Sequence, residues 1–108
     1  MSLAEQTYLL TRGFPKEELF GLTSQIRRAV SSIPANIAEG WGRSCRAEFR
    51  QFLRIAQGSL RELETHLLLS TRTGICQAYQ IQPLLETITI LGKQILSLHR
   101  KLELKKKS

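Results

Sequence analysis

Apolar residues along this chain recur at alternating steps of three and four, the spacing of one buried face of an α-helix. Strand-like alternation of apolar and polar residues is nearly absent. Three apolar runs are visible: Leu19, Leu22, Ile26, Ala29, Val30, Ile33, Ile37; then Phe49, Leu53, Ala56, Leu60, Leu63, Leu67; then Leu84, Ile88, Leu91, Ile95, Leu98, Leu102. The pattern predicts an all-α protein whose helices cross at the shallow angle of a bundle.

Local chemistry predicts where the helices begin and end. Pro15 and Pro83 each suit the first position of a helix. Ser44 suits an N-cap, and Gly74 can close the helix that Ser44 opens. We therefore expect a single domain, residues 1–108, with helices at about residues 3–12, 16–40, 44–73 and 83–104. The first helix, roughly 15 Å long, is too short to cover a neighbour of roughly 45 Å.

The segment "SSIPANIAEGWGRS" places poor helix formers inside a helical pattern. Pro34 removes a backbone donor and clashes with the preceding turn, yet helical spacing resumes directly after it. We therefore expect a proline kink in the second helix, with Asn36 hydrogen-bonded to a backbone group that the kink frees. A ligand site around Asn36 and Glu39 is the alternative. Close backbone contact is the expected reason for three glycines that interrupt helices: Gly21, Gly58 and Gly92.

Composition limits the classes of protein that fit. A chain of 108 residues with 42% hydrophobic residues matches one small globular domain. Two cysteines are too few for a disulfide framework and, with two distant histidines, do not provide a zinc site. We expect no metal and no other cofactor. No apolar run approaches the roughly 20 residues of a membrane span, and no basic region precedes the first apolar residues. The cytoplasm is the expected location.

The net charge of +7 is concentrated after residue 40. Arg46, Arg50, Arg54 and Arg61 share a strip about 80° wide on the third predicted helix, roughly 120° from its apolar face, so they are expected to face solvent. Two further groups extend the positive charge: Arg43 before the helix, and Lys105, Lys106 and Lys107 at the end of the chain. Guanidinium groups offer paired donors to phosphate, so the strip predicts non-specific binding of RNA or DNA. A solvated face, or pairing between subunits, is the alternative.

Few other residues indicate chemistry. Trp41 is the one candidate for stacking on bases, and packing at the helix junction is the interpretation we favour for it. His66 and His99 are isolated and lack the Glu-x-x-His spacing of di-iron bundles. No phosphate-binding glycine loop follows a strand, as such loops require. We expect that the protein is not an enzyme.

Two stretches, "FPKEELFGLTSQIRRAVSSIPANIAEGWGRS" and "EFRQFLRIAQGSLRELETHL", together resemble the four-helix-bundle family of 23S rRNA intervening-sequence proteins. That family includes the accessory variability proteins of diversity-generating retroelements. The matching motif residues are Pro34, Asn36, Glu39, Gly40, Gly58, Ser59 and Glu62. The resemblance implies an antiparallel up-and-down four-helix bundle that assembles as a homopentamer, with a reverse transcriptase or another protein as a further partner. The shortened first helix departs from the family's usual length.

These observations predict a non-catalytic basic bundle that binds RNA or DNA largely through phosphate contacts and acts as an accessory or scaffold protein. The alternative is a structural homo-oligomer with no direct role in nucleic-acid binding. In that case a protein partner would dock in the groove that the short first helix leaves.

Overall fold

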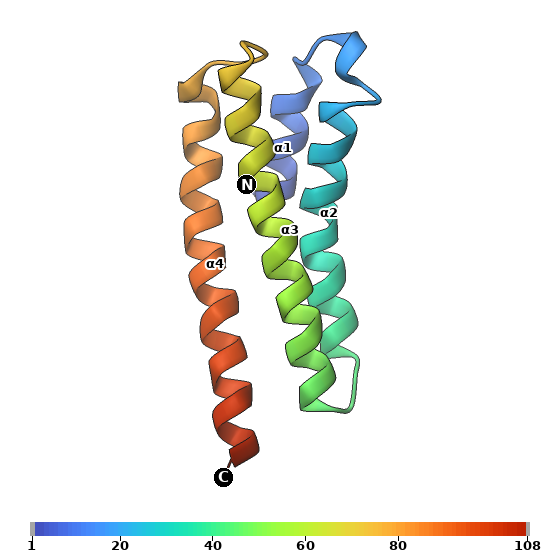
Figure 1. The fold of residues 1–108 in the computed structure, drawn as a ribbon, viewed down its shortest axis with the longest axis vertical. Helices are drawn as coiled ribbons and strands as arrows, with labels where there is room; N and C mark the ends of the chain where they lie inside the picture. The colour runs from blue at the N-terminus through green and yellow to red at the C-terminus, as the bar shows by residue number, and fades with distance from the viewer. Residues whose placement is uncertain (1, 108) are drawn as a thin grey trace.

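Helices make up nearly all of the structure, a computed structural model that describes the backbone of residues 2–107 and the side chains of residues 2–103. The elements are α1 (Leu3–Arg12), the 3₁₀ turn η1 (Lys16–Glu18), α2 (Leu22–Trp41), α3 (Arg46–Arg72) and α4 (Ala78–Lys107). Successive α-helices run in opposite directions along the long axis of a body of 51 × 23 × 22 Å (Figure 1). The described residues contain no strand, so the all-α fold class is confirmed. None of the helices in this range combines the length and apolarity that crossing a membrane requires.

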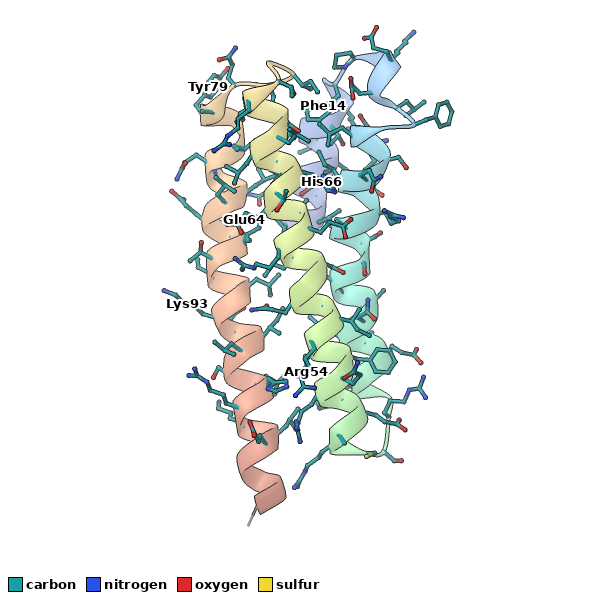
Figure 2. The ribbon with its side chains drawn as sticks, in the orientation of Figure 1. Phe14, Arg54, Glu64, His66, Tyr79 and Lys93 are labelled. Atoms are coloured by element: carbon teal, nitrogen blue, oxygen red, sulfur yellow. The ribbon has the colours of Figure 1, made fainter. Side chains whose placement is uncertain are left out.

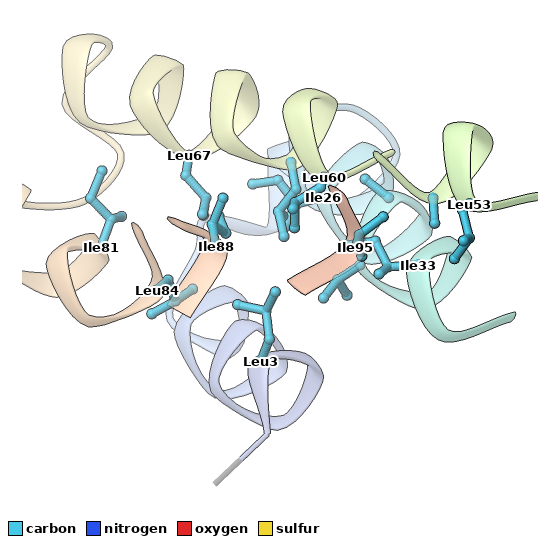
Figure 3. Close-up of a cluster of buried hydrophobic side chains, with 14 of the residues drawn as sticks. Leu3, Ile26, Ile33, Leu53, Leu60, Leu67, Ile81, Leu84, Ile88 and Ile95 are labelled. Carbon is cyan, nitrogen blue, oxygen red and sulfur yellow. The ribbon is translucent and has the colours of Figure 1, made fainter. Parts of the chain in front are cut away.

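Each long helix turns one apolar face toward a common core, shown in Figure 3. On α3 the predicted spacing of three and four is kept by residues that are at most 1% exposed: Leu53, Ala56, Leu60, Leu63 and Leu67. Ile26 and Ile33 of α2 and Ile88 of α4 pack against this face. One predicted core position is wrong, because Leu19 precedes the start of α2 and is 47% exposed.

The first helix is fixed at its start by a capping box. The Ser2 hydroxyl accepts from the Glu5 N–H at 3.2 Å, and the Glu5 carboxylate accepts from the Ser2 N–H at 3.1 Å. α1 then runs for 10 residues, about 15 Å, against 27 residues, about 40 Å, for α3. It packs on α2 and α4 only along the upper half of the bundle in Figure 1. The shortened first helix is therefore present, and it leaves the lower half with three walls.

An apolar groove lies where the fourth wall ends. It encloses a cavity of about 280 Å³ whose main apolar lining comes from Val30, Ile33 and Ile37 of α2 and from Leu91 of α4, with the start of α1 at one end. Leu98, further along α4, is only half-buried. The groove expected from the short first helix is thus part of the structure.

The second helix begins later than predicted. Residues 16–18 form a 3₁₀ turn, and α2 starts at Leu22 after a break at which Phe20 is 95% exposed. Gly21 stands at the N-cap with φ −110° and ψ −111°, outside the helical region. A glycine opposes helix continuation because it loses more backbone entropy than other residues. The apolar residues Leu19 and Phe20 resemble the start of a buried helical face, but both side chains are exposed to solvent.

Pro34 lies inside α2, which continues through it to Trp41. The Asn36 amide donates from Nδ2 to the carbonyl of Ser32 at 2.8 Å. The carbonyl that Pro34 leaves without its N–H partner is that of Val30, four residues back, so the prediction that Asn36 binds the freed group is wrong. The kink itself stays a prediction.

The last two helices also differ from prediction at their starts. α3 begins at Arg46 after Cys45, whose side chain makes no capping bond, instead of after Ser44. α4 begins at Ala78, five residues before Pro83, because the Gln80 side chain accepts from the Gln77 N–H at 2.8 Å and caps the first turn. Gly74, with φ 78°, follows the end of α3 in the left-handed conformation that glycine favours, as expected.

Candidate nucleic-acid interface

The arginines predicted on the third helix follow the seam between α3 and α4, near the lower end of the bundle. Arg46 is the first residue of α3, and Arg50 and Arg54 follow at intervals of four, over about 12 Å of helix. We call these three residues the lower strip. Arg46 and Arg54 are exposed and Arg50 is half-buried. Figure 2 places Arg54 on the side of α3 that faces α4, so the Arg54 end of the lower strip lies at a groove and not on the outer wall of the helix.

The lower strip differs from the rest of the predicted site in its ion pairs. Its three guanidinium groups form no ion pair with any carboxylate among residues 2–103. Arg43, by contrast, places Nη2 2.6 Å from Oε1 of Glu39, and Arg61 places Nη1 2.9 Å from Oε1 of Glu64. The predicted set therefore divides into three arginines available to a ligand and two that are already paired within the protein.

Two residues of α4, His99 and Arg100, lie along this seam, and the pattern of the sequence did not place them beside the arginines. Burial lowers the pKa of His99, and the charges of Arg54 and then Arg50 lower it further, while Glu103 acts in the opposite direction. His99 therefore lies within the field of the lower strip. Arg100 follows His99 directly and is exposed, one helical turn beyond the seam residue Leu96. The interval of four residues places Arg100 on the same face of α4 as Leu96. Only the packing of α4 on α3 shows that this face of α4 meets the lower strip.

Two further predicted contributors belong to the same end of the bundle. The backbone of α4 continues there to Lys107 (Figure 1), while the side chains of Lys105, Lys106 and Lys107 lie outside the described residues. Trp41, the last residue of α2, meets the ring of Phe49 edge-on at 5.9 Å and is still 77% exposed. Trp41 thus packs at the helix junction and also presents most of its indole to solvent.

The motif residues that carry the family resemblance mainly join α2 to α3. The hydroxyls of Ser32 and Ser59 are 2.9 Å apart, and Asn36 Nδ2 reaches the same Ser32 hydroxyl at 2.9 Å. Gly40 allows the end of α2 to approach Phe49 closely, since an added Cβ would stand 2.8 Å from the ring. These contacts assign Asn36, Gly40 and Ser59 to helix packing.

The acidic motif residues are also engaged within the protein. Glu39 pairs with Arg43, and Glu62 Oε1 lies 3.8 Å from Arg28 Nη2 and 3.6 Å from His66 Nε2. The amide nitrogen of Asn36 is hydrogen-bonded to Ser32, and the carboxylate of Glu39 is paired with Arg43. These contacts favour a structural role for the two residues over a ligand site.

The three interrupting glycines differ from one another. A Cβ on Gly92 would lie 2.9 Å from Arg61 Nη2, so this glycine sits at the close contact that we expected. A Cβ on Gly21 would be 3.7 Å from Glu18, an ordinary distance, and one on Gly58 would meet nothing within 4 Å. Close contact is therefore wrong as the reason for Gly21, which precedes α2, and for Gly58, which is exposed on α3.

Comparison with known proteins supports the resemblance drawn from these motifs. Residues 1–97 match the family model described as 23S rRNA-intervening sequence protein. A comparison with curated proteins gives no match. The matched region includes the whole of α1, α2 and α3 and most of α4. The chain therefore belongs to the 23S rRNA-intervening sequence protein family.

Proposed function

We propose that this chain is a non-catalytic helical-bundle protein that binds RNA or DNA, largely through phosphate contacts, as an accessory or scaffold protein. The observation that carries the proposal is the lower strip, whose three arginines have no carboxylate partner among the described side chains. Guanidinium forks match phosphate oxygens with paired donors. The family description names 23S rRNA, which makes RNA the first ligand to test. Two free cysteines fit a role in the reducing cytoplasm.

The spacing of the lower strip sets the expected strength of binding. About 12 Å of helix axis corresponds to roughly three phosphates along one strand of a duplex. Three such contacts give a slope of about −3 in a plot of log affinity against log salt. Phosphate contacts fix position without reading sequence, so affinity should depend weakly on base composition.

The test is a salt titration of labelled duplex RNA and duplex DNA with the full chain. The double variant Arg50→Glu and Arg54→Glu should lose at least tenfold in affinity for both duplexes. The matched control is Arg12→Glu with Arg72→Glu, which makes the same change in net charge at exposed positions at the other end of the bundle. Equal losses of affinity in the two double variants would show that binding depends on the net charge of the protein and not on the lower strip. Salt-insensitive or absent binding by the unmodified chain would refute the proposal.

The second candidate is a structural homo-oligomer that binds a protein partner. Its support is the apolar groove between α2 and α4, which none of the helices described within residues 2–107 covers below the start of α1. By family resemblance the oligomer is a homopentamer and the partner a reverse transcriptase or another protein. Sedimentation equilibrium at several concentrations tests the assembly, since a mass of five chains supports it and a mass of one chain refutes it.

A further inference from the structure

A second cavity opens beside the lower strip, between α3 and α4. It measures about 230 Å³ and is lined by Leu53, Arg54 and Gln57 of α3 and by Ile95, Leu96 and His99 of α4. Leu53 and Ile95 are buried, whereas Arg54 and Leu96 are exposed at its rim. The cavity therefore has apolar walls, a positively charged edge and access from solvent.

Two buried polar atoms on residues that line this cavity, and a third on Arg50, one helical turn before Arg54, have no hydrogen-bond partner within residues 2–103. They are Oε1 of Gln57, Nε2 of His99 and Nε of Arg50. The other end of the Gln57 amide reaches the carbonyl of Gly92 only at 3.5 Å, the limit of a hydrogen bond. Buried polar atoms without partners are few in native proteins. Three of them at one seam indicate a site that takes a polar ligand.

The chemistry of these atoms limits what the ligand can be. Gln57 Oε1 needs a donor, while Arg50 Nε needs an acceptor. A phosphate offers only acceptors near neutral pH, so it leaves the Gln57 oxygen unsatisfied. The edge of a nucleobase carries donors and acceptors together, and its faces suit apolar walls, an imidazole ring or a guanidinium plane. The lowered pKa of His99 keeps its imidazole neutral near pH 7, with one donor and one acceptor nitrogen.

Resting on the proposed function, we infer that this cavity receives the base of one unpaired nucleotide while the lower strip binds the phosphates on either side of it. The volume of the cavity is consistent with a base inside it and the sugar and phosphates outside. About 230 Å³ is less than the roughly 300–1,000 Å³ of pockets that enclose whole drug-sized molecules, so a single ring system enters and the sugar and phosphates stay outside. A base stacked within a duplex cannot enter. The protein should therefore prefer bulges and loops to continuous duplex.

The experiment compares three labelled RNA hairpins with the same stem by fluorescence anisotropy. The first is fully paired, the second carries a one-nucleotide bulge, and the third carries an abasic nucleotide at the bulge. The last two have equal charge and differ only in the base. The unmodified chain should bind the bulged hairpin about tenfold more tightly than the abasic one, as expected for one base on a side-chain platform. The salt slopes of these two hairpins should be equal.

Two glutamine variants locate the base on the protein. Gln57→Leu removes the amide at constant charge and should bring the ratio of bulged to abasic affinity close to one, with affinity for the paired hairpin unchanged. The control is Gln51→Leu, at an exposed position of the same helix, which should keep the tenfold ratio. Melting curves followed by circular dichroism verify that both variants fold. If Gln57→Leu fails to fold, His99→Leu replaces it.

The other possible results distinguish failure of the nucleobase site from failure of the proposed function. Equal affinity for bulged and abasic hairpins, with a normal salt slope, overturns the nucleobase site and leaves the proposed function intact. A base preference that survives Gln57→Leu and His99→Leu overturns the assignment to this cavity. Absence of salt-dependent binding to all three hairpins overturns the proposed function itself.

Discussion

Gly40 of α2 lies against the ring of Phe49 of α3, so close that a Cβ on Gly40 would stand 2.8 Å from Cδ1 of that ring. The Phe52 Cβ is equally near, at 2.8 Å from the same position. Both neighbours belong to the first turns of α3, and Gly40 and Phe49 are themselves buried. The glycine thus sets how closely the two helices approach just before the loop that leads to the lower strip.

Substitution of Gly40 should therefore destabilise the bundle, whereas the same substitution at Gly58 should stabilise it. Gly40→Ala forces the two phenylalanines apart and should cost about 1–3 kcal/mol of unfolding free energy. Gly58→Ala meets open space inside a helix and should gain up to about 1 kcal/mol through the higher helix propensity of alanine. Urea denaturation measures both. Destabilisation by Gly58→Ala would contradict this account and would indicate that a second chain packs at that position.

The buried faces could be predicted from sequence because a core position needs little more than an apolar side chain at the right helical interval. Leu60 and Leu63 of α3 satisfy that condition and are fully buried. The predicted positions of helix ends were wrong where the interaction that fixes the end has no strong signal in the sequence. The start of α4 is one example, because the residue at its N-cap is Gln77, and glutamine is not among the favoured N-cap residues.

The candidate site, like the fold, could be predicted from the sequence only in part. Arginines four residues apart share a helix face whatever the tertiary structure, so the lower strip follows from spacing alone. The ion pair of Arg61 with Glu64 and the position of His99 beside the strip depend on side-chain conformation and on which edge of α4 meets α3. The ion pair joins residues three apart on α3, whereas the approach of α4 that places His99 beside the strip is tertiary.

The ion pairs predict unequal effects of single charge removals on nucleic-acid binding. Arg46→Gln and Arg54→Gln should each weaken binding and reduce the magnitude of the salt slope by about 1, since each removes one phosphate contact. Arg43→Gln and Arg61→Gln should change the slope much less, because their guanidinium groups already pair with carboxylates. Anisotropy titrations at four or more salt concentrations give the slopes. Equal changes in all four variants would contradict a localised interface.

The polar link between α2 and α3 should contribute to stability as a unit. Asn36→Ala removes two hydrogen bonds to Ser32, and we expect a loss of about 1 kcal/mol. Ser59→Ala removes the partner hydroxyl across the interface. A double-mutant cycle between Asn36→Ala and Ser59→Ala, measured by urea denaturation, should show coupling of at least about 0.5 kcal/mol, because both side chains bind the Ser32 hydroxyl. Ser31→Ala, at an exposed position of the same helix, is the control and should change stability by less than about 0.5 kcal/mol. Strict additivity would show that the three side chains act independently.

His99 should make stability depend on pH in a defined range. Burial lowers the pKa of His99 most, the charges of Arg54 and Arg50 of α3 lower it further, and Glu103 of α4 opposes them. In the unfolded chain the pKa of a histidine returns to roughly 6.5. Between the lowered value and roughly 6.5, the unfolded chain binds more protons than the folded protein, so stability falls as the pH decreases through this range. Glu5, whose pKa is lowered by its bonds to Ser2, titrates in a more acidic range and does not interfere.

The expected result is a melting temperature that is constant above about pH 7 and decreases as the pH falls below about 6.5. His99→Gln should flatten this part of the profile, because glutamine keeps a polar side chain at the seam without a titrating group. Circular dichroism melts at half-unit pH intervals measure the profile for both proteins. Bound RNA should oppose the decrease, since phosphates near Arg50 and Arg54 offset the positive charge that disfavours the protonated imidazole. An identical pH profile for the unmodified chain and His99→Gln would show that folding does not lower the pKa of His99.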